Sequence, residues 1–85
     1  MTRIIAHIAT EGVLLMTNLQ QKRKDARMTQ RELAAGAGVS VRTLQHYEQG
    51  ALNINKAAGA MLYRLAQALD CAMEDLLEKG RDGLE

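Results

Sequence analysis

Apolar residues recur at helical spacing along most of the chain, which predicts a bundle of short helices. Five segments each predict one helix: residues 17–26, 30–37, 41–49, 56–69 and 73–79. Apolar positions at helical spacing indicate the last four, and the capping-box spacing of Thr17 and Gln20 indicates the first. The stripe over 56–69 is the widest, and Asn55 stands where an N-cap is expected. The sequence contains no Phe, Trp or Pro, so Leu, Ile, Val, Met and Ala must fill the core. We therefore expect an all-α, compact five-helix domain over residues 17–80, followed by a frayed tail at 81–85.

Residues 1–16 do not continue this pattern. Their apolar residues are interrupted by His7, Glu11 and Gly12, and the stretch is too short and too polar to span a bilayer or to serve as a signal peptide. Alternating apolar residues over 4–8 leave a β-strand or an amphipathic arm open, but disorder is our expectation for this N-terminal extension. We expect a cytoplasmic protein without membrane contact.

Residues 29–50, TQRELAAGAGVSVRTLQHYEQG, contain two helical patterns joined by a short turn. Thr29 and Glu32 have the spacing of a capping box at the start of the first helix. Gly38 supplies the left-handed residue that commonly ends a helix, and Ser40 is a good N-cap for the second helix. Two short helices joined in this way are typical of a helix-turn-helix.

The second helix of this motif has two unlike sides. Leu44, Tyr47 and Glu48 share the side that is expected to face the core. The opposite side has no evident core to fill, and it carries residues that are able to contact a partner: Val41, Arg42, Gln45, His46 and Gln49.

This segment resembles the helix-turn-helix of the phage repressor and Cro class of DNA-binding proteins, the Xre family. The Thr-Gln opening, the Leu-Ala pair, the Gly-Val-Ser turn and the closing Glu-x-Gly all stand at the family spacing. Arg23, seven residues before Gln30, matches the arginine usual in the family. The resemblance covers residues 17–78 and implies a lambda-repressor-like fold. It also implies a structural ion pair between Arg23 and Glu48.

The resemblance implies that the second helix enters the major groove, where each base pair shows its own pattern of donors and acceptors. Arg42 suits guanine, Gln45 suits adenine, His46 donates or accepts according to its tautomer, and Val41 suits a thymine methyl. Contacts to the phosphate backbone are expected from polar residues around this helix: Arg27, Gln30, Arg31, Gln49, Asn53, Asn55 and Lys56. The alternative for each of these residues is an ordinary solvated surface.

Charge and cysteine content narrow the function further. The formal net charge is +1, but residues 16–50 hold six basic and three acidic side chains, whereas residues 51–85 hold four basic and six acidic ones. The first of these halves favours an anionic partner, although a small imbalance also fits a plain surface. No His-x-x-x-His or Cys-x-x-Cys spacing occurs, and we interpret the single Cys71 as a small buried hydrophobe. We expect no enzyme activity, no metal site and no cofactor.

The function that we expect is sequence-specific binding to double-stranded operator DNA by a homodimeric transcriptional regulator, specifically a repressor. A protein-interaction module with the same fold, such as an antitoxin that holds a toxin, is the alternative. The length fits one small domain, so we expect no separate ligand-sensing domain.

We expect the N-terminal extension to be either disordered or a result of the choice of start site. Met16 stands directly before the first capping signal, and the codons for Glu11, Gly12 and Val13 are able to spell a purine-rich ribosome-binding sequence. N-terminal sequencing of protein expressed from its native gene tests this, with Met16 as the expected start.

Overall fold

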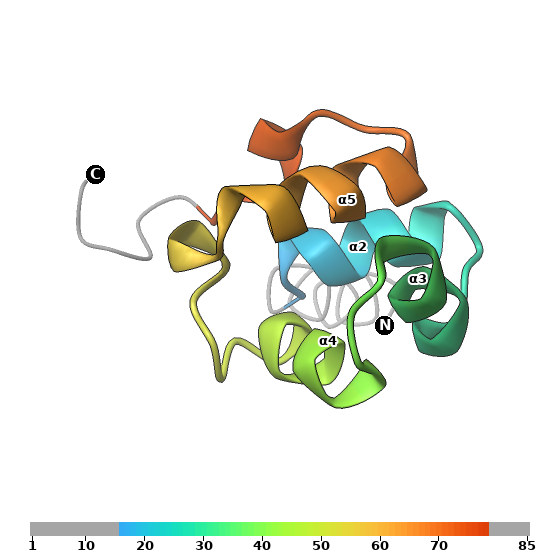
Figure 1. The fold of residues 1–85 in the computed structure, drawn as a ribbon, viewed down its shortest axis with the longest axis horizontal. Helices are drawn as coiled ribbons and strands as arrows, with labels where there is room; N and C mark the ends of the chain where they lie inside the picture. The colour runs from blue at the N-terminus through green and yellow to red at the C-terminus, as the bar shows by residue number, and fades with distance from the viewer. Residues whose placement is uncertain (1–15, 79–85) are drawn as a thin grey trace, which may run out of the picture.

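A computed structural model gives the fold, and it describes residues 16–78 (Figure 1). That part of the chain contains four α-helices and two short 3-10 helices. In chain order they are α2 (Asn18–Asp25), α3 (Gln30–Ala37), α4 (Val41–Glu48), η1 (Ile54–Lys56), α5 (Gly59–Leu69) and η2 (Met73–Leu76). Our expectations for residues 1–15 and 79–85 fall outside the described residues.

The five-helix count is not confirmed, because the helix expected over 73–79 is the 3-10 helix η2. It ends after Leu76, since Leu77 takes an extended backbone with φ −76° and ψ 150°. The long helix also differs from the prediction, beginning at Gly59 without a side-chain cap. Asn55, its expected cap, lies instead within η1, where the side chain of Asn53 accepts a hydrogen bond from the Asn55 N–H.

The helix-turn-helix is built as its capping residues predict. Thr29 Oγ1 accepts from the Glu32 N–H, and Glu32 Oε1 accepts from the Thr29 N–H, at 3.0 and 2.8 Å. Gly38 ends α3 in the left-handed conformation with φ 69°. Ser40 Oγ then accepts from the Thr43 N–H at 3.0 Å and starts α4. The confirmed caps fix the short turn that sets α4 at an angle to α3.

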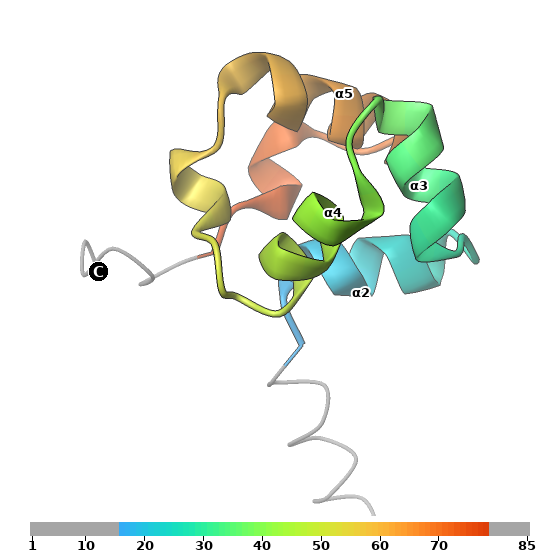
Figure 2. The ribbon, with the colours of Figure 1, turned by 60° about the horizontal axis from the view of Figure 1, so that its bottom comes forward.

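Helix α4 lies on the side of the molecule opposite η2. Figure 1 shows α4 at the bottom and the orange-red segment of η2 at the top. When the bottom is turned forward, α4 lies in front between α3 and η1, and η2 lies behind (Figure 2). The second helix of the motif is therefore at one surface of the domain, with an element on either side of it.

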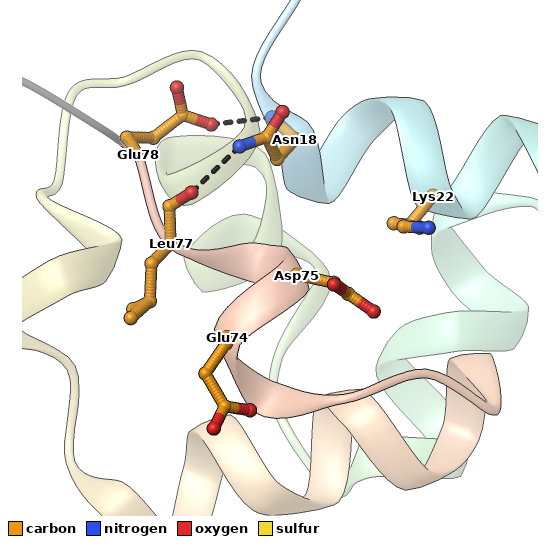
Figure 3. A pocket seen from close by; sticks show the side chains of 6 residues that line it. All are labelled: Asn18, Lys22, Glu74, Asp75, Leu77 and Glu78. Carbon is orange, nitrogen blue, oxygen red and sulfur yellow. Dashed lines mark hydrogen bonds between the residues drawn. The ribbon is translucent and has the colours of Figure 1, made fainter.

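The last described residues bind back to the start of α2. The Asn18 N–H donates to a Glu78 carboxylate oxygen, and Asn18 Nδ2 donates to the Leu77 carbonyl (Figure 3). Asn55 completes the clamp, because its Nδ2 donates to the Glu78 carbonyl at 2.7 Å and its Oδ1 accepts from the Glu78 N–H at 2.8 Å. These contacts join three distant parts of the chain, namely α2, η1 and the segment after η2.

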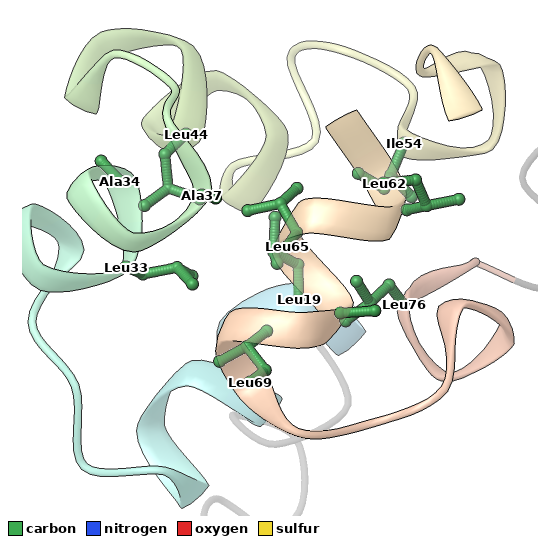
Figure 4. Close-up of a cluster of buried hydrophobic side chains, with 11 residues drawn as sticks. Leu19, Leu33, Ala34, Ala37, Leu44, Ile54, Leu62, Leu65, Leu69 and Leu76 are labelled. Carbon is green, nitrogen blue, oxygen red and sulfur yellow. The ribbon is translucent and has the colours of Figure 1, made fainter. Parts of the chain in front are cut away.

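One hydrophobic cluster connects all of these elements (Figure 4). Helix α5 contributes the largest share, and its packing against α3 is the most extensive helix contact in the domain. The buried apolar residues are Leu19, Leu33, Ala34, Ala37, Leu44, Ile54, Leu62, Leu65, Ala66, Leu69 and Leu76. Leucine dominates this core, as the absence of Phe and Trp requires.

Arg27 adopts a backbone conformation that suits glycine better than arginine. Its φ is 59°, in the left-handed region, directly after the end of α2. For a residue with a Cβ this region is unfavourable by about 1–2 kcal/mol. The side chain is exposed, so the fold itself gains little from having an arginine there.

We predict that Arg27→Gly stabilises the domain. Relief of the left-handed strain exceeds the extra conformational entropy of glycine in the unfolded chain, which gives a net gain of about 0.5–1 kcal/mol. Urea unfolding followed by circular dichroism measures the change. Lys24→Gly is the matched control, since Lys24 is exposed within α2, and there glycine is expected to destabilise by about 1 kcal/mol. Equal losses in the two variants would contradict the prediction.

Candidate nucleic-acid interface

Helix α4 places apolar and polar residues on opposite sides. Leu44 and Glu48 are 1% and 3% exposed, and the partly buried Tyr47 packs against the same core. Arg42 and Gln49 are exposed on the other side, and Gln45 and His46 are half-buried. The division of the helix into an inward and an outward side therefore follows the sequence pattern.

Val41 is the exception. We expected it on the side without a core to fill, but it is partly buried and packs against the hydrophobic cluster. As the first residue of α4 it lies where the turn from α3 meets the core. Only part of its side chain is available to a partner.

An ion pair ties α4 to α2, as the sequence predicts. Arg23 Nε donates to Glu48 Oε2 at 2.6 Å, and Arg23 Nη2 donates to Glu48 Oε1 at 3.1 Å. A third guanidinium nitrogen, Nη1, donates to the Met28 carbonyl at 2.8 Å. The Glu48 side chain is 1% exposed and that of Arg23 12%, so the pair is almost fully removed from water. Such a pair holds its two helices in one geometry, because neither charge is tolerated alone.

Two glutamines extend this pair toward the outward side of α4. Gln30 Nε2 donates to Glu48 Oε1 at 3.0 Å, and Gln45 Nε2 donates to Gln30 Oε1 at 3.1 Å. No local pattern in the sequence indicates this chain of contacts, because it joins side chains from α2, α3 and α4. Gln45 keeps its carbonyl oxygen and one N–H, which are the groups that a pairing with adenine requires.

The elements on both sides of α4 carry exposed cations. Arg27 lies in the turn before α3, Arg31 is the second residue of α3, and Lys56 is in η1. Figure 2 shows α3 and η1 on either side of α4. Gln49 is exposed at the end of α4, whereas Gln30 is half-buried in the network around Glu48.

Asn53 and Asn55 are already engaged in the fold. The Asn53 side chain caps η1, and the Asn55 amide binds the backbone of Glu78 with both its donor and its acceptor. These two residues order the loop that carries Lys56.

Arg64 is a positioning residue that sequence reasoning missed. Its Nε donates to the Ala37 carbonyl at 2.7 Å and so ties α5 to the last turn of α3. This contact spans 27 residues, so no local pattern in the sequence indicates it. The hydrogen bond therefore attaches the turn of the helix-turn-helix to α5.

Two acidic residues of the C-terminal half, Glu74 and Asp75, lie away from α4. Glu74 and Asp75 belong to η2, which both views place on the opposite side of the molecule (Figures 1 and 2).

Cys71 is half-buried rather than fully buried, and it packs against the core. Burial raises the pKa of its thiol, and the nearby Asp75 carboxylate raises this pKa further. The thiol therefore stays protonated at neutral pH and is a weak nucleophile. Within the described residues, no group of three or more His, Cys, Asp or Glu side chains is arranged to hold a metal ion. No helix of residues 16–78 has the length and apolar character needed to cross a membrane.

The fold and the exposed side of α4 define a helix-turn-helix domain. Residues 19–76 match the profile of the helix-turn-helix family, and the chain belongs to that family, in its phage repressor and Cro (Xre-like) branch. This is a family of DNA-binding domains, which are not typically enzymes. Comparison with the curated proteins and with the solved structures gave no match.

We predict that Arg23→Leu destabilises the domain by about 3–5 kcal/mol, because it leaves the Glu48 carboxylate buried without its cation. The double variant Arg23→Leu/Glu48→Leu should recover part of this loss, since it removes the stranded charge as well. Urea unfolding of both variants gives the difference in free energy. Lys24→Leu, on the exposed side of α2, is the control and should change stability by less than about 0.5 kcal/mol. If Arg23→Leu lowered the free energy of unfolding no more than Lys24→Leu does, the ion pair would contribute nothing to stability.

Proposed function

We propose that this protein is a transcriptional repressor that binds double-stranded DNA in a sequence-specific manner, with α4 as its recognition helix. The observation that carries the proposal is the placement of α4: one side is anchored by the buried Glu48, the other exposes Arg42, and α3 and η1, which flank α4, carry the exposed Arg31 and Lys56. A helix of this width fits the major groove, and cations on either side of it suit the phosphates of the two strands.

Arg42 is the main reader of sequence in this proposal. It is the second residue of α4, and the N-terminal end of a recognition helix is the part that meets base edges. Its planar guanidinium pairs with O6 and N7 of guanine, which a lysine ammonium does not match. Gln45 and His46 read neighbouring bases, and the exposed part of Val41 meets a thymine methyl.

The phosphate contacts fall into two groups around α4. Arg27, Gln30 and Arg31 serve one strand from the start of α3, and Gln49 and Lys56 serve the other from the end of α4 and from η1. Asn53 and Asn55 complete the second group, chiefly by holding the Lys56 loop, because both amides already bind the backbone of the domain.

A homodimer is the assembly that we propose on DNA. One recognition helix reads too few base pairs for useful specificity, and two helices about 34 Å apart enter successive major grooves. The proposed contacts between the subunits are the corner at residues 70–73, the segment 73–79 and Leu84. The C-terminal side is favoured because α4 must remain free for the groove.

Arg42→Ala should lower affinity for the preferred operator by about 1–3 kcal/mol and relax the preference at one base pair. Lys56→Ala should instead weaken binding to all duplexes alike and make the dependence on salt shallower by about one unit of slope. Fluorescence anisotropy with an operator selected from random duplexes, and with a scrambled duplex, separates the two results. An equal loss on both duplexes for Arg42→Ala would assign Arg42 to phosphate and pass base reading to Gln45 and His46.

We predict a two-fold symmetric dimer on a palindromic operator. Light scattering of the free protein and of its DNA complex measures the stoichiometry, which should be two chains per operator. One chain per duplex at saturating protein would refute the dimer.

Binding to duplex DNA that weakens steeply with salt is the test of the proposed function as a whole. Its absence would leave the alternative, a protein-interaction module of the antitoxin kind that uses this fold without DNA.

A further inference from the structure

The Thr17 hydroxyl joins two helices. Its Oγ1 accepts from the Gln20 N–H at 3.2 Å, which is the N-cap of α2. The same oxygen donates to the Glu48 carbonyl at 2.9 Å, at the C-terminal end of α4. A hydroxyl has one hydrogen and two lone pairs, so both bonds form at once. The cap is a local feature of the sequence, but the bond to α4 spans 31 residues.

The bond to Glu48 meets a need of the recognition helix. The last four carbonyls of an α-helix have no partner within the helix. In α4 the carbonyls of Gln45, His46 and Tyr47 accept from backbone N–H groups of the chain that follows, namely Gln49, Leu52 and Gly50. The Glu48 carbonyl differs, because it accepts from a side chain of another helix.

Glu48 is thus held by α2 at two points. Arg23 binds its carboxylate, and Thr17 binds its backbone carbonyl. A single point of attachment would leave the helix free to tilt about it, and a second point removes that freedom. An eight-residue helix is about 12 Å long, so a tilt of about 10° at Glu48 moves the far end by about 2 Å.

We propose that Thr17 is a positioning residue that sets the angle at which α4 enters the major groove, and so contributes to sequence discrimination without touching DNA. The inference rests on the proposed function. Hydrogen bonds to base edges fail when donor and acceptor move apart by 1 Å, whereas attraction to phosphates changes little over that distance. Loss of the Thr17 bond to Glu48 therefore reduces affinity for the operator more than affinity for other duplexes.

The test separates the two bonds of the hydroxyl. Thr17→Ser keeps both of them, and Thr17→Asp keeps the cap but cannot donate to the Glu48 carbonyl. Affinity for the selected operator and for a scrambled duplex is measured at two salt concentrations. The ratio of the two affinities should stay unchanged in Thr17→Ser and fall about threefold to tenfold in Thr17→Asp, as expected for one lost hydrogen bond.

Gln20→Glu is the matched control for the added charge. It places a carboxylate in the same first turn of α2 and leaves the Thr17 hydroxyl intact. Repulsion between this charge and DNA should weaken both duplexes alike and fade as salt rises, with the affinity ratio unchanged. Should Thr17→Asp fail to fold, the isosteric Thr17→Val replaces it, and the same fall in the ratio is expected.

A lower melting temperature in Thr17→Asp with an unchanged affinity ratio would overturn the proposal and leave Thr17 a purely structural residue. A wild-type protein that binds no duplex would instead refute the proposed function. In that case the hydrogen-exchange rates of the α4 amides test whether Thr17 holds α4 in position. These amides should exchange faster in Thr17→Asp than in Gln20→Glu, and equal rates would overturn the inference.

Discussion

The fold depends on the burial of one carboxylate, that of Glu48. A charged carboxylate removed from water must be paired and hydrogen-bonded, or the folded state loses several kcal/mol. Here the partners come from two other helices, Arg23 from α2 and Gln30 from α3. The requirement that Glu48 be satisfied therefore fixes α2, α3 and α4 relative to one another, in a domain whose leucine-rich core is less directional.

The same carboxylate connects the interior to the surface. From Glu48 the hydrogen bonds pass through Gln30 to Gln45, whose side chain is half-buried on α4. An amide fixed in this way has lost much of its rotational freedom before any partner arrives, which favours selective over adaptable contacts.

Local signals in the sequence predicted the helix-turn-helix well, because caps and turns depend on neighbours. Thr29, Glu32, Gly38 and Ser40 all act where their spacing placed them. Distant contacts explain what the sequence did not predict. Asn55 looked like a helix cap, but its amide binds Glu78, 23 residues away, and α5 starts later as a result. Val41 and Arg64 were misjudged or missed for the same reason, since their partners are remote in sequence. The ion pair of Arg23 with Glu48 was predicted only because the resemblance to a family implies it. Periodicity alone does not predict such a contact.

Helix α2 thus has a part in holding α4 that its sequence does not indicate. Its N-cap Thr17 and its residue Arg23 bind the end of α4, and Asn18 binds the C-terminal segment that Asn55 joins to η1. The two parts of the domain that are proposed to touch DNA, α4 and the η1 loop, are therefore both connected by hydrogen bonds to the start of α2. Thr17 binds α4 directly, and Asn18 reaches η1 through the segment at residues 77–78. Because the start of α2 lies outside the helix-turn-helix, substitutions in it are able to alter DNA binding while the motif itself stays intact. The spacing of contacts within the motif is set by local caps, but its orientation toward a partner is set by a helix that precedes it.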